Sequence, residues 1–238
     1  MKRLLTLLLA SALLFCACGR STEIPQTTRP ANTAANASAG TTGTGENASE
    51  NDNAADTDAP RILVAYFAVA ENSEVDAVSS ASVLMDNGEA KGMSQYVAEC
   101  IAEMTGGDLF SIRTETKYPG SYNPLADYAK REQDNDERPA LITHIENLDD
   151  YDVIFVGYPI WWYTLPMALF SFFDEYDFTG KTIIPFDTHF GSGRGGTPDV
   201  IAELEPGATV EKNSFAVNQT KAADCWQDVA DWLGELGY

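Results

Sequence analysis

Short apolar runs that alternate with helix-like segments are the feature that most constrains how this 238-residue chain can fold. The runs at 61–67 and 152–158 are apolar after their first residue, as in strands buried on both faces of a parallel sheet, and 181–188 is a further predicted strand. Weaker runs at 108–113 and 210–217 bring the predicted strands to five. The predicted helices cover 94–105, 123–133, 165–176, 197–204 and 221–236.

This alternation predicts an α/β fold, a three-layer, doubly wound, five-stranded parallel sheet with helices on both faces. Ligands of such sheets bind beyond the carboxyl ends of the strands, where the strand order reverses. The loops after Phe67, Tyr158 and Thr188 are therefore the segments in which to look for a site.

The first 18 residues resemble a bacterial lipoprotein signal. A basic start is followed by an apolar run from Leu4 to Phe15, too short to span a bilayer, and then by Ala17 and Cys18. A small residue before a cysteine is typical of an acylation site, so Cys18 is the predicted lipidated residue. The alternative is an ordinary secretory peptide cleaved nearby. Either interpretation predicts export, and the first predicts a lipid-anchored protein of the bacterial cell envelope.

Residues 19–60 have a different composition from the rest of the chain. From Thr27 to Asp58 they carry almost no large apolar side chain, so they cannot bury enough surface to offset chain entropy. We expect a disordered tether, or a leader without a role, ahead of a single domain at 61–238. That domain holds 30 acidic and 11 basic residues, a net charge of −19. Such acidity argues against nucleic acid as a partner and favours partners with a basic surface.

Two loops of the domain have the composition of ligand-binding segments. Pro159 to Tyr163 contains two adjacent tryptophans just past a strand, and an indole there offers a stacking surface to a planar ligand. Alternatively, one tryptophan packs under the loop and the other is half exposed. The glycines between Thr188 and Thr197 let backbone N–H groups approach a ligand, although such a loop can also be merely flexible.

Five segments follow one another in the order seen in the flavodoxin-like family, and they are most similar to its bacterial branch with a Pro-x-Trp-Trp loop. These segments are Ile62–Phe67, Gly107–Phe110, Gly157–Trp162, Gly180–Phe186 and Thr188–Gly193. The resemblance covers nearly all of 61–238 and implies strand order 2-1-3-4-5, non-covalent FMN binding and electron transfer. It implies two groups of flavin contacts: Pro159, Ile160, Trp161, Trp162 and Tyr163 flanking the isoalloxazine, and Thr188, His189, Phe190, Gly191, Ser192 and Gly193 offering backbone donors to the pyrimidine side.

The segment after the first strand departs from the family pattern. Where the family has Ser/Thr-x-Thr-Gly-Asn-Thr to cradle the FMN phosphate, this chain has 68–73 without the glycine, and Glu71 would repel a phosphate. An insert at 74–90 then leads to Lys91, Gly92, Met93 and Ser94. These four residues resemble the family's helix start, where free amides, the Ser94 hydroxyl and the Lys91 charge would hold the phosphate. Alternatively, Ser94 is only an N-cap and the insert covers an emptied cleft.

His189 and the two cysteines of the domain are further candidates for a functional role. His189 would lie near the flavin edge and could give it a hydrogen bond or a proton, or it could be a solvated loop residue. Cys100 and Cys225 fall on the first and last helices, which lie side by side in the flavodoxin-like arrangement, so they form either a disulfide or two small buried thiols. No metal site is predicted, because the chain has neither a Cys-x-x-Cys pair nor a His-Glu-x-x-His run.

Together, the resemblance and the lipoprotein-type signal imply an FMN-binding redox protein on the outer face of a membrane. It is either an electron carrier or a small FMN-dependent oxidoreductase of the NAD(P)H:acceptor or quinone reductase type. The expected partner is a redox protein or a small electron acceptor. The alternative is a flavodoxin-like module that has lost FMN and binds another ligand or a protein.

Overall fold

The computed structural model describes residues 59–74 and 82–238. The predicted signal peptide at 1–18, the lipidation site Cys18 and all but the last two residues of the predicted tether lie outside the described residues. Among the helices of the described ranges, none is long and apolar enough to cross a membrane.

Three neighbouring parallel strands form the centre of the sheet: β1 (Ile62–Tyr66), β5 (Val153–Pro159) and β6 (Thr182–His189). Val64 pairs with Phe155, and Phe155 pairs with Ile184. Every residue of β5 is buried. The continuous apolar runs are therefore strands covered on both faces, as predicted.

Shorter strands extend the sheet on both sides. β4 (Asp108–Ser111) pairs with β1, while β7 (Thr209–Val210) and β8 (Phe215–Asn218) both pair with β6, all in parallel. With β7 and β8 counted as one strand, the order β4-β1-β5-β6-β7/β8 is the predicted 2-1-3-4-5, so the fold class is confirmed. The continuous strand predicted at 210–217 is wrong, because the Asn213 amide donates to the Glu211 carboxylate and the intervening residues leave the ladder.

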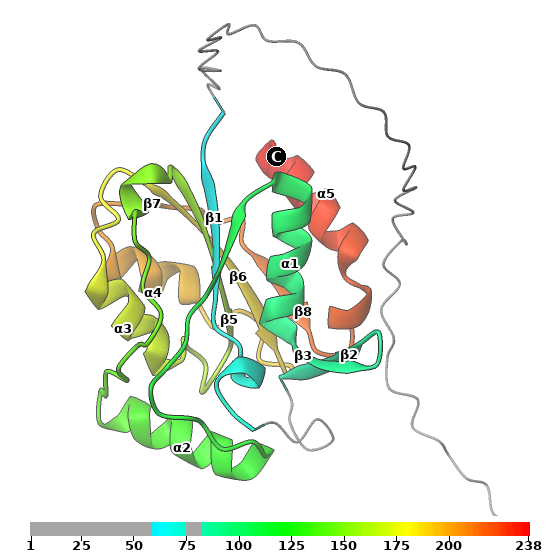
Figure 1. Ribbon diagram of the computed structural model, residues 1–238, viewed down its shortest axis with the longest axis vertical. Helices are drawn as coiled ribbons and strands as arrows, with labels where there is room; N and C mark the ends of the chain where they lie inside the picture. The colour runs from blue at the N-terminus through cyan, green and yellow to red at the C-terminus, as the bar shows by residue number, and fades with distance from the viewer. Residues whose placement is uncertain (1–58, 75–81) are drawn as a thin grey trace, which may run out of the picture.

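Helices cover both faces of the sheet (Figure 1). α1 (Met93–Thr105) and α5 (Trp226–Leu236) lie side by side on one face, and α3 (Met167–Glu175) and α4 (Thr197–Leu204) lie on the other. The last helix was predicted at 221–236, but a 3-10 turn at Ala222–Asp224 precedes α5 and the helix is interrupted at Cys225. α2 (Tyr122–Asp134) lies beyond the end of the sheet at which β1 finishes.

Part of the predicted insert at 74–90 is an ordered β-hairpin. β2 (Val83–Asp86) and β3 (Glu89–Gly92) pair antiparallel around Asn87 and Gly88, which both have positive φ. Asn-Gly is the dipeptide that favours two-residue hairpin turns, so the sequence contained a signal for this element. The hairpin ends directly at α1, and Lys91 and Gly92 are therefore strand residues.

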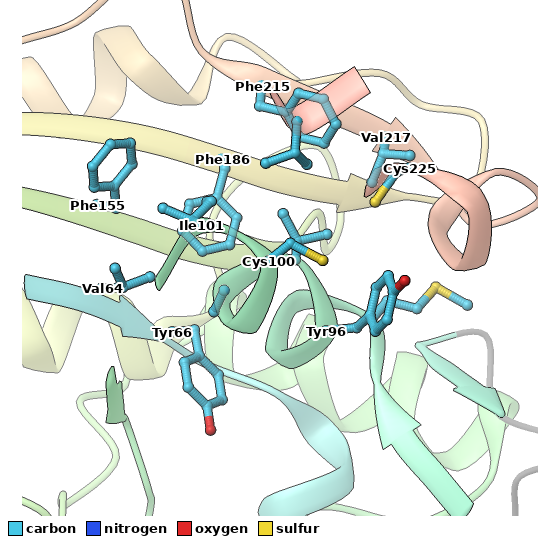
Figure 2. Packing of buried hydrophobic residues seen from close by; sticks show 14 of the residues in the cluster. Val64, Tyr66, Tyr96, Cys100, Ile101, Phe155, Phe186, Phe215, Val217 and Cys225 are labelled. Carbon is cyan, nitrogen blue, oxygen red and sulfur yellow. The ribbon is translucent and has the colours of Figure 1, made fainter. Parts of the chain in front are cut away.

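The core between the sheet and the α1/α5 layer is shown in Figure 2. Val64 and Phe186 lie in this core together with Ile101 of α1, whereas the Phe155 ring packs edge-on against Trp232 of α5, and all of these side chains are buried. Gly157 of β5 has to be a glycine, because a Cβ there would lie 2.1 Å from the Phe186 ring. Large apolar side chains thus fix how α1 sits on the sheet, and with it the position of the α1 N-terminus.

The predicted disulfide is not formed. Cys100 and Cys225 belong to this same core and are present as buried thiols that are not bonded to each other. Burial raises the pKa of the Cys225 thiol, and the neighbouring Cys100 adds to the shift. The structure therefore has the alternative arrangement, in which the two cysteines are small buried thiols.

Candidate functional site

One cavity of about 580 Å³ lies beyond the carboxyl ends of β5 and β6, beside the start of α1. Cavities of this size hold cofactors and drug-sized ligands. We call its two extremities the ring end (Pro159–Tyr163 and Thr188–Ser192) and the helix end (Ser82 and Met93). The predicted site residues that line it are Met93, Pro159, Ile160, Trp161, Trp162, Tyr163, Thr188, His189, Phe190, Gly191 and Ser192.

The double-tryptophan loop is a tight turn with a strained backbone. The Trp161 amide donates to the Thr164 carbonyl and the Thr164 amide donates back to Trp161, both at 3.0 Å. The two central residues, Trp162 and Tyr163, have φ of 47° and 67°. This is the type I′ geometry that normally requires Asn or Gly, and bulky residues adopt it at a cost of about 1–2 kcal/mol each. Strain of this kind is characteristic of functional sites.

The two tryptophans have different roles. The Trp161 ring packs edge-on against Phe67 and Tyr118, with ring centroids 5.6 and 5.3 Å apart, and so anchors the turn to the sheet. Trp162 is 44% exposed, and its indole N–H donates to the Ala126 carbonyl of α2 at 2.8 Å. The alternative in which one tryptophan packs below and the other is half exposed therefore describes the loop, and the half-exposed ring lines the cavity.

The glycine loop uses its amides differently from the prediction. The amides of Gly191 and Gly193 donate to Nδ1 of His189, at 3.1 and 3.2 Å. These two donors are thus directed at the loop's own histidine, which corrects the expectation that they face a ligand. Gly193 does not line the cavity. A Cβ on Gly195 would lie 2.5 Å from the Tyr163 carbonyl oxygen, so the two loops of the ring end are in close contact.

Buried hydroxyls and partly used amides characterise the helix end. The Met93 amide donates to the Ser82 carbonyl, and the Gly92 amide donates to Oε1 of Gln95. The buried Ser94 hydroxyl lies 3.1 Å from that of Thr188, which joins α1 to β6. The N-cap residue is Gly92, so the alternative in which Ser94 caps the helix is wrong. Gly92 also packs tightly, since a Cβ there would be 2.5 Å from that of Ala68.

Two predicted charges near the phosphate position are engaged elsewhere. The Lys91 ammonium contacts Asp86 at 2.7 Å and Glu99 at 2.6 Å, which ties the hairpin to α1 and leaves Lys91 outside the cavity lining. The Glu71 carboxylate accepts a hydrogen bond from Ser111 at 2.7 Å. The expectations that Lys91 attracts a phosphate and that Glu71 repels it are therefore both corrected, because carboxylate and hydroxyl partners hold the two side chains.

One wall of the cavity was missing from the predicted set. It consists of Ser82 and of four residues on one face of α2, namely Tyr122, Leu125, Ala126 and Ala129. Their spacing of three and four residues indicates an apolar helix face. The sequence could have identified that face, but not the cavity that it covers. At the mouth of the cavity, the exposed rings of Tyr122 and Phe190 lie 6.2 Å apart.

Two buried acids lie close to the cavity without lining it. Asp187 is the residue of β6 that directly precedes Thr188. It is 1% exposed, and its Oδ1 has no hydrogen-bond partner among the described residues. Burial raises the pKa of Asp187 to about 7. Burial likewise raises the pKa of Glu132 on α2 to about 7, although the Tyr118 hydroxyl donates to it at 3.2 Å. Neither acid belongs to a cluster of metal-ligating side chains within the described ranges.

The cavity has features that fit FMN. The strained Trp162–Tyr163 turn offers aromatic surface to a planar ring at one end. At the other end, the cavity reaches Met93, the first residue of α1, where helix amides and the partial positive charge of the helix favour an anion. Ser82 also lines the cavity at that end. The residues therefore fit a ligand with a planar ring and an anionic group.

Comparison with known proteins gives one family and several solved structures. The flavodoxin family model matches residues 82–236, so the match begins inside the 74–90 insert and leaves out the first strand and residues 68–73. A protein of Bacteroides eggerthii described as a flavoprotein is 27% identical, covers 76% of this chain and 99% of its own, and superposes with a TM-score of 0.57. A similarly described protein of Bacteroides uniformis is 24% identical over 74% of this chain and 98% of its own, with a TM-score of 0.54.

A third structure, a flavoprotein of Lactobacillus acidophilus in complex with FMN, is 17% identical over 74% of this chain and 99% of its own, with a TM-score of 0.49. No curated protein matches the chain.

Proposed function

Because the chain belongs to the flavodoxin family, we propose that it is a redox protein that binds FMN non-covalently in the cavity beyond β5 and β6. Membership of the family and the likeness to the Bacteroides eggerthii protein support a flavin-binding function, with FMN as the cofactor. FMN, when bound, supplies one- and two-electron transfer. The chain itself supplies the position of the ring, its surroundings and the exclusion of water.

The strained Trp162–Tyr163 turn is the observation that carries the proposal. A turn that costs conformational energy and directs large rings at a cavity is explained if those rings hold a planar ligand. The ring end therefore takes the isoalloxazine, and α2 forms the wall opposite the glycine loop. The helix end takes the phosphate, held by Ser82 and by α1 amides other than that of Met93, which already donates to the Ser82 carbonyl. The predicted phosphate contact Ser94 lies outside the cavity lining, and its buried hydroxyl is 3.1 Å from that of Thr188.

Titration of the purified chain with FMN and with riboflavin tests this function, followed by quenching of flavin fluorescence. Tight, near-stoichiometric FMN binding with weaker riboflavin binding is expected, because only FMN carries the phosphate. Equal affinities would show that the helix end does not hold a phosphate. No binding of either flavin at high micromolar concentration would overturn the proposal.

A second candidate function is a module that has lost FMN and binds another ligand or a protein. It is favoured by the amides of Met93, Gly191 and Gly193, which donate within the protein instead of standing ready for a ligand. The same titration separates the two functions, since this module would stay colourless after addition of FMN. In that case the aromatic ring end would serve a different planar group.

The acidity of the domain supports an electron partner with a basic surface. A net charge of −19 over residues 61–238 steers basic partners toward the molecule at low salt and disfavours further negative charge in the cavity. The proposal therefore includes a low reduction potential and an electron partner with a basic surface. Anaerobic reduction by NADH or NADPH distinguishes a small reductase, which is reduced directly, from a carrier, which requires a protein partner.

The proposal also includes export and a lipid anchor at Cys18. Its support is the sequence of residues 1–18, together with a tether composition that would hold the domain away from a membrane. Metabolic labelling with a fatty-acid analogue tests the anchor. Label and membrane association are expected for the wild type and should be lost in Cys18→Ser. Equal labelling of the two proteins would overturn this part of the proposal.

A further inference from the structure

His189 is held by the loop that follows it. It is the last residue of β6, and its Nδ1 accepts hydrogen bonds from the amides of Gly191 and Gly193, at 3.1 and 3.2 Å. Both glycines have positive φ, which turns their N–H groups back toward the ring. The glycine loop is thus organised around one nitrogen of one imidazole.

These two hydrogen bonds determine where the proton of the imidazole lies. A ring nitrogen that accepts from N–H donors carries no proton, so the neutral ring of His189 is protonated at Nε2. A proton on Nδ1 would face two amide N–H groups and would break both hydrogen bonds. Partial burial lowers the pKa of His189 as well. Both effects favour the neutral ring.

The remaining edge of the ring is available to a ligand. His189 lines the cavity at the ring end, between the aromatic turn and the glycine loop. Its Nδ1 edge faces its own loop, which leaves Nε2–H on the opposite side of the ring. No residue within 59–74 or 82–238 accepts a hydrogen bond from this nitrogen.

We propose that His189 is a binding residue with a fixed tautomer. Its Nε2–H donates a hydrogen bond to a carbonyl oxygen or an unprotonated ring nitrogen at the edge of the planar ligand, and it is not a proton donor of the site. The identity of the acceptor as part of a flavin rests on the proposed function. The tautomer itself is a property of the ligand-free protein and is tested without FMN.

The first experiment is a long-range ¹H–¹⁵N correlation on the ligand-free full chain with ¹⁵N-labelled histidine, recorded as a function of pH. His189 is expected as the Nε2–H tautomer, and it should stay neutral below the pH at which an ordinary histidine is protonated. His144 is the only other histidine, is exposed and contacts Glu175, so His144→Gln assigns the two sets of signals. An Nδ1–H tautomer, or an imidazolium at neutral pH, would overturn the proposal.

The second experiment uses two variants to test the Nδ1 and the Nε2 edges of the His189 ring independently. In His189→Asn, a side-chain oxygen can replace Nδ1 as the acceptor of the loop amides, but nothing replaces Nε2–H. In His189→Gln, the amide reaches the Nε2 position but leaves the loop amides without their acceptor. Hydrogen exchange of the Gly191 and Gly193 amides should therefore stay slow in the Asn variant and become fast in the Gln variant.

The loss of FMN affinity in the Asn variant then measures the contribution of the hydrogen bond that Nε2–H of His189 donates. The Asn variant is expected to bind FMN roughly three- to tenfold more weakly than the wild type, the value of one neutral hydrogen bond. Unchanged affinity with slow glycine exchange would overturn the role as a donor. If the wild type binds no FMN, the proposed function fails, while the tautomer measured on the ligand-free protein still supports or overturns the inference about His189.

Discussion

The ring end and the helix end of the cavity differ in how they are built. At the ring end, a strained aromatic turn and a glycine loop folded around His189 are in close contact, with Gly195 against the Tyr163 carbonyl. At the helix end, the Met93 amide already donates to Ser82, and Lys91, the nearest predicted cation, is held by Asp86 and Glu99. One end is preorganised for a planar ring, and the other keeps few donors for an anion.

This difference shows which part of a ligand should dominate its affinity. Preorganised aromatic surface binds at little entropic cost, whereas a phosphate at the helix end gains only the remaining amides and hydroxyls. We therefore expect the ring to contribute more to FMN affinity than the phosphate. The following predictions test that order.

The largest effect is expected for Gly195→Ala. The new Cβ would lie 2.5 Å from the Tyr163 carbonyl oxygen at φ +59°, so the two loops of the ring end must separate. Overpacking of this kind costs about 1–3 kcal/mol, and FMN affinity should fall roughly ten- to hundredfold. Gly196→Ala is the matched control, since it has φ +73° but no neighbour within 4 Å. Equal losses of affinity in the two variants would show that contact between the loops is unimportant.

At the helix end, Lys91→Met should affect stability rather than phosphate recognition. Asp86, whose side chain is 6% exposed, would lose a cationic partner, and the free energy of unfolding should fall by about 2 kcal/mol. The ratio of FMN to riboflavin affinity should stay unchanged. Lys212→Met removes an exposed ion pair to Asp199 and should change stability by less than about 0.5 kcal/mol. A selective loss of FMN affinity in Lys91→Met would restore Lys91 as a phosphate ligand.

Tyr163 allows the strain of the aromatic turn to be measured. Tyr163 is 71% exposed, so both Tyr163→Gly and Tyr163→Ala remove the ring with little loss of packing. Only glycine relieves the positive φ, and the Gly variant should be more stable than the Ala variant by about 1 kcal/mol in denaturant unfolding. Both should weaken FMN binding equally. A stability difference near zero would mean that the turn stores no strain.

A pH-dependent effect is expected at α2, which walls the cavity between its two ends. The pKa of Glu132 is raised to about 7, so the folded state binds a proton that the unfolded state releases at lower pH. Stability should therefore fall as the pH rises from about 5 to 7 and level off above that, with a slope from Glu132 of at most about 1.4 kcal/mol per pH unit, the value for one proton. Glu132→Gln keeps an acceptor for Tyr118 and should flatten this slope in chemical denaturation.

The corresponding control is Asp127→Asn, at an exposed position on α2 itself. It should leave the pH dependence of stability unchanged. A slope identical in the wild type and Glu132→Gln would show that Glu132 is ionised in the folded protein throughout this range. The buried Asp187 is expected to contribute in the same direction in both proteins, because its pKa is raised as well.

Features that depend on contiguous residues were predictable from the sequence, whereas contacts between residues far apart in the chain were not. The three buried strands and the aromatic turn were found because their residues are contiguous and unlike their surroundings. Lys91 was misassigned because its partner Glu99 lies one helix turn or more into α1, and only the packed hairpin shows that Asp86 joins it. The α2 wall was missed because an apolar helix face does not reveal what it faces.

The sequence alone determined the order of strands and helices, and with it the edge of the sheet at which a site must lie, because strand and helix periodicity are properties of the chain itself. It also placed aromatic rings and glycines at that edge. Only the tertiary structure decided how these residues share their hydrogen bonds: the loop amides on His189, the Met93 amide on Ser82 and the Lys91 ammonium on two carboxylates. An N–H group that is directed at one acceptor is not directed at a ligand, and which acceptor it meets depends on distances that sequence does not contain.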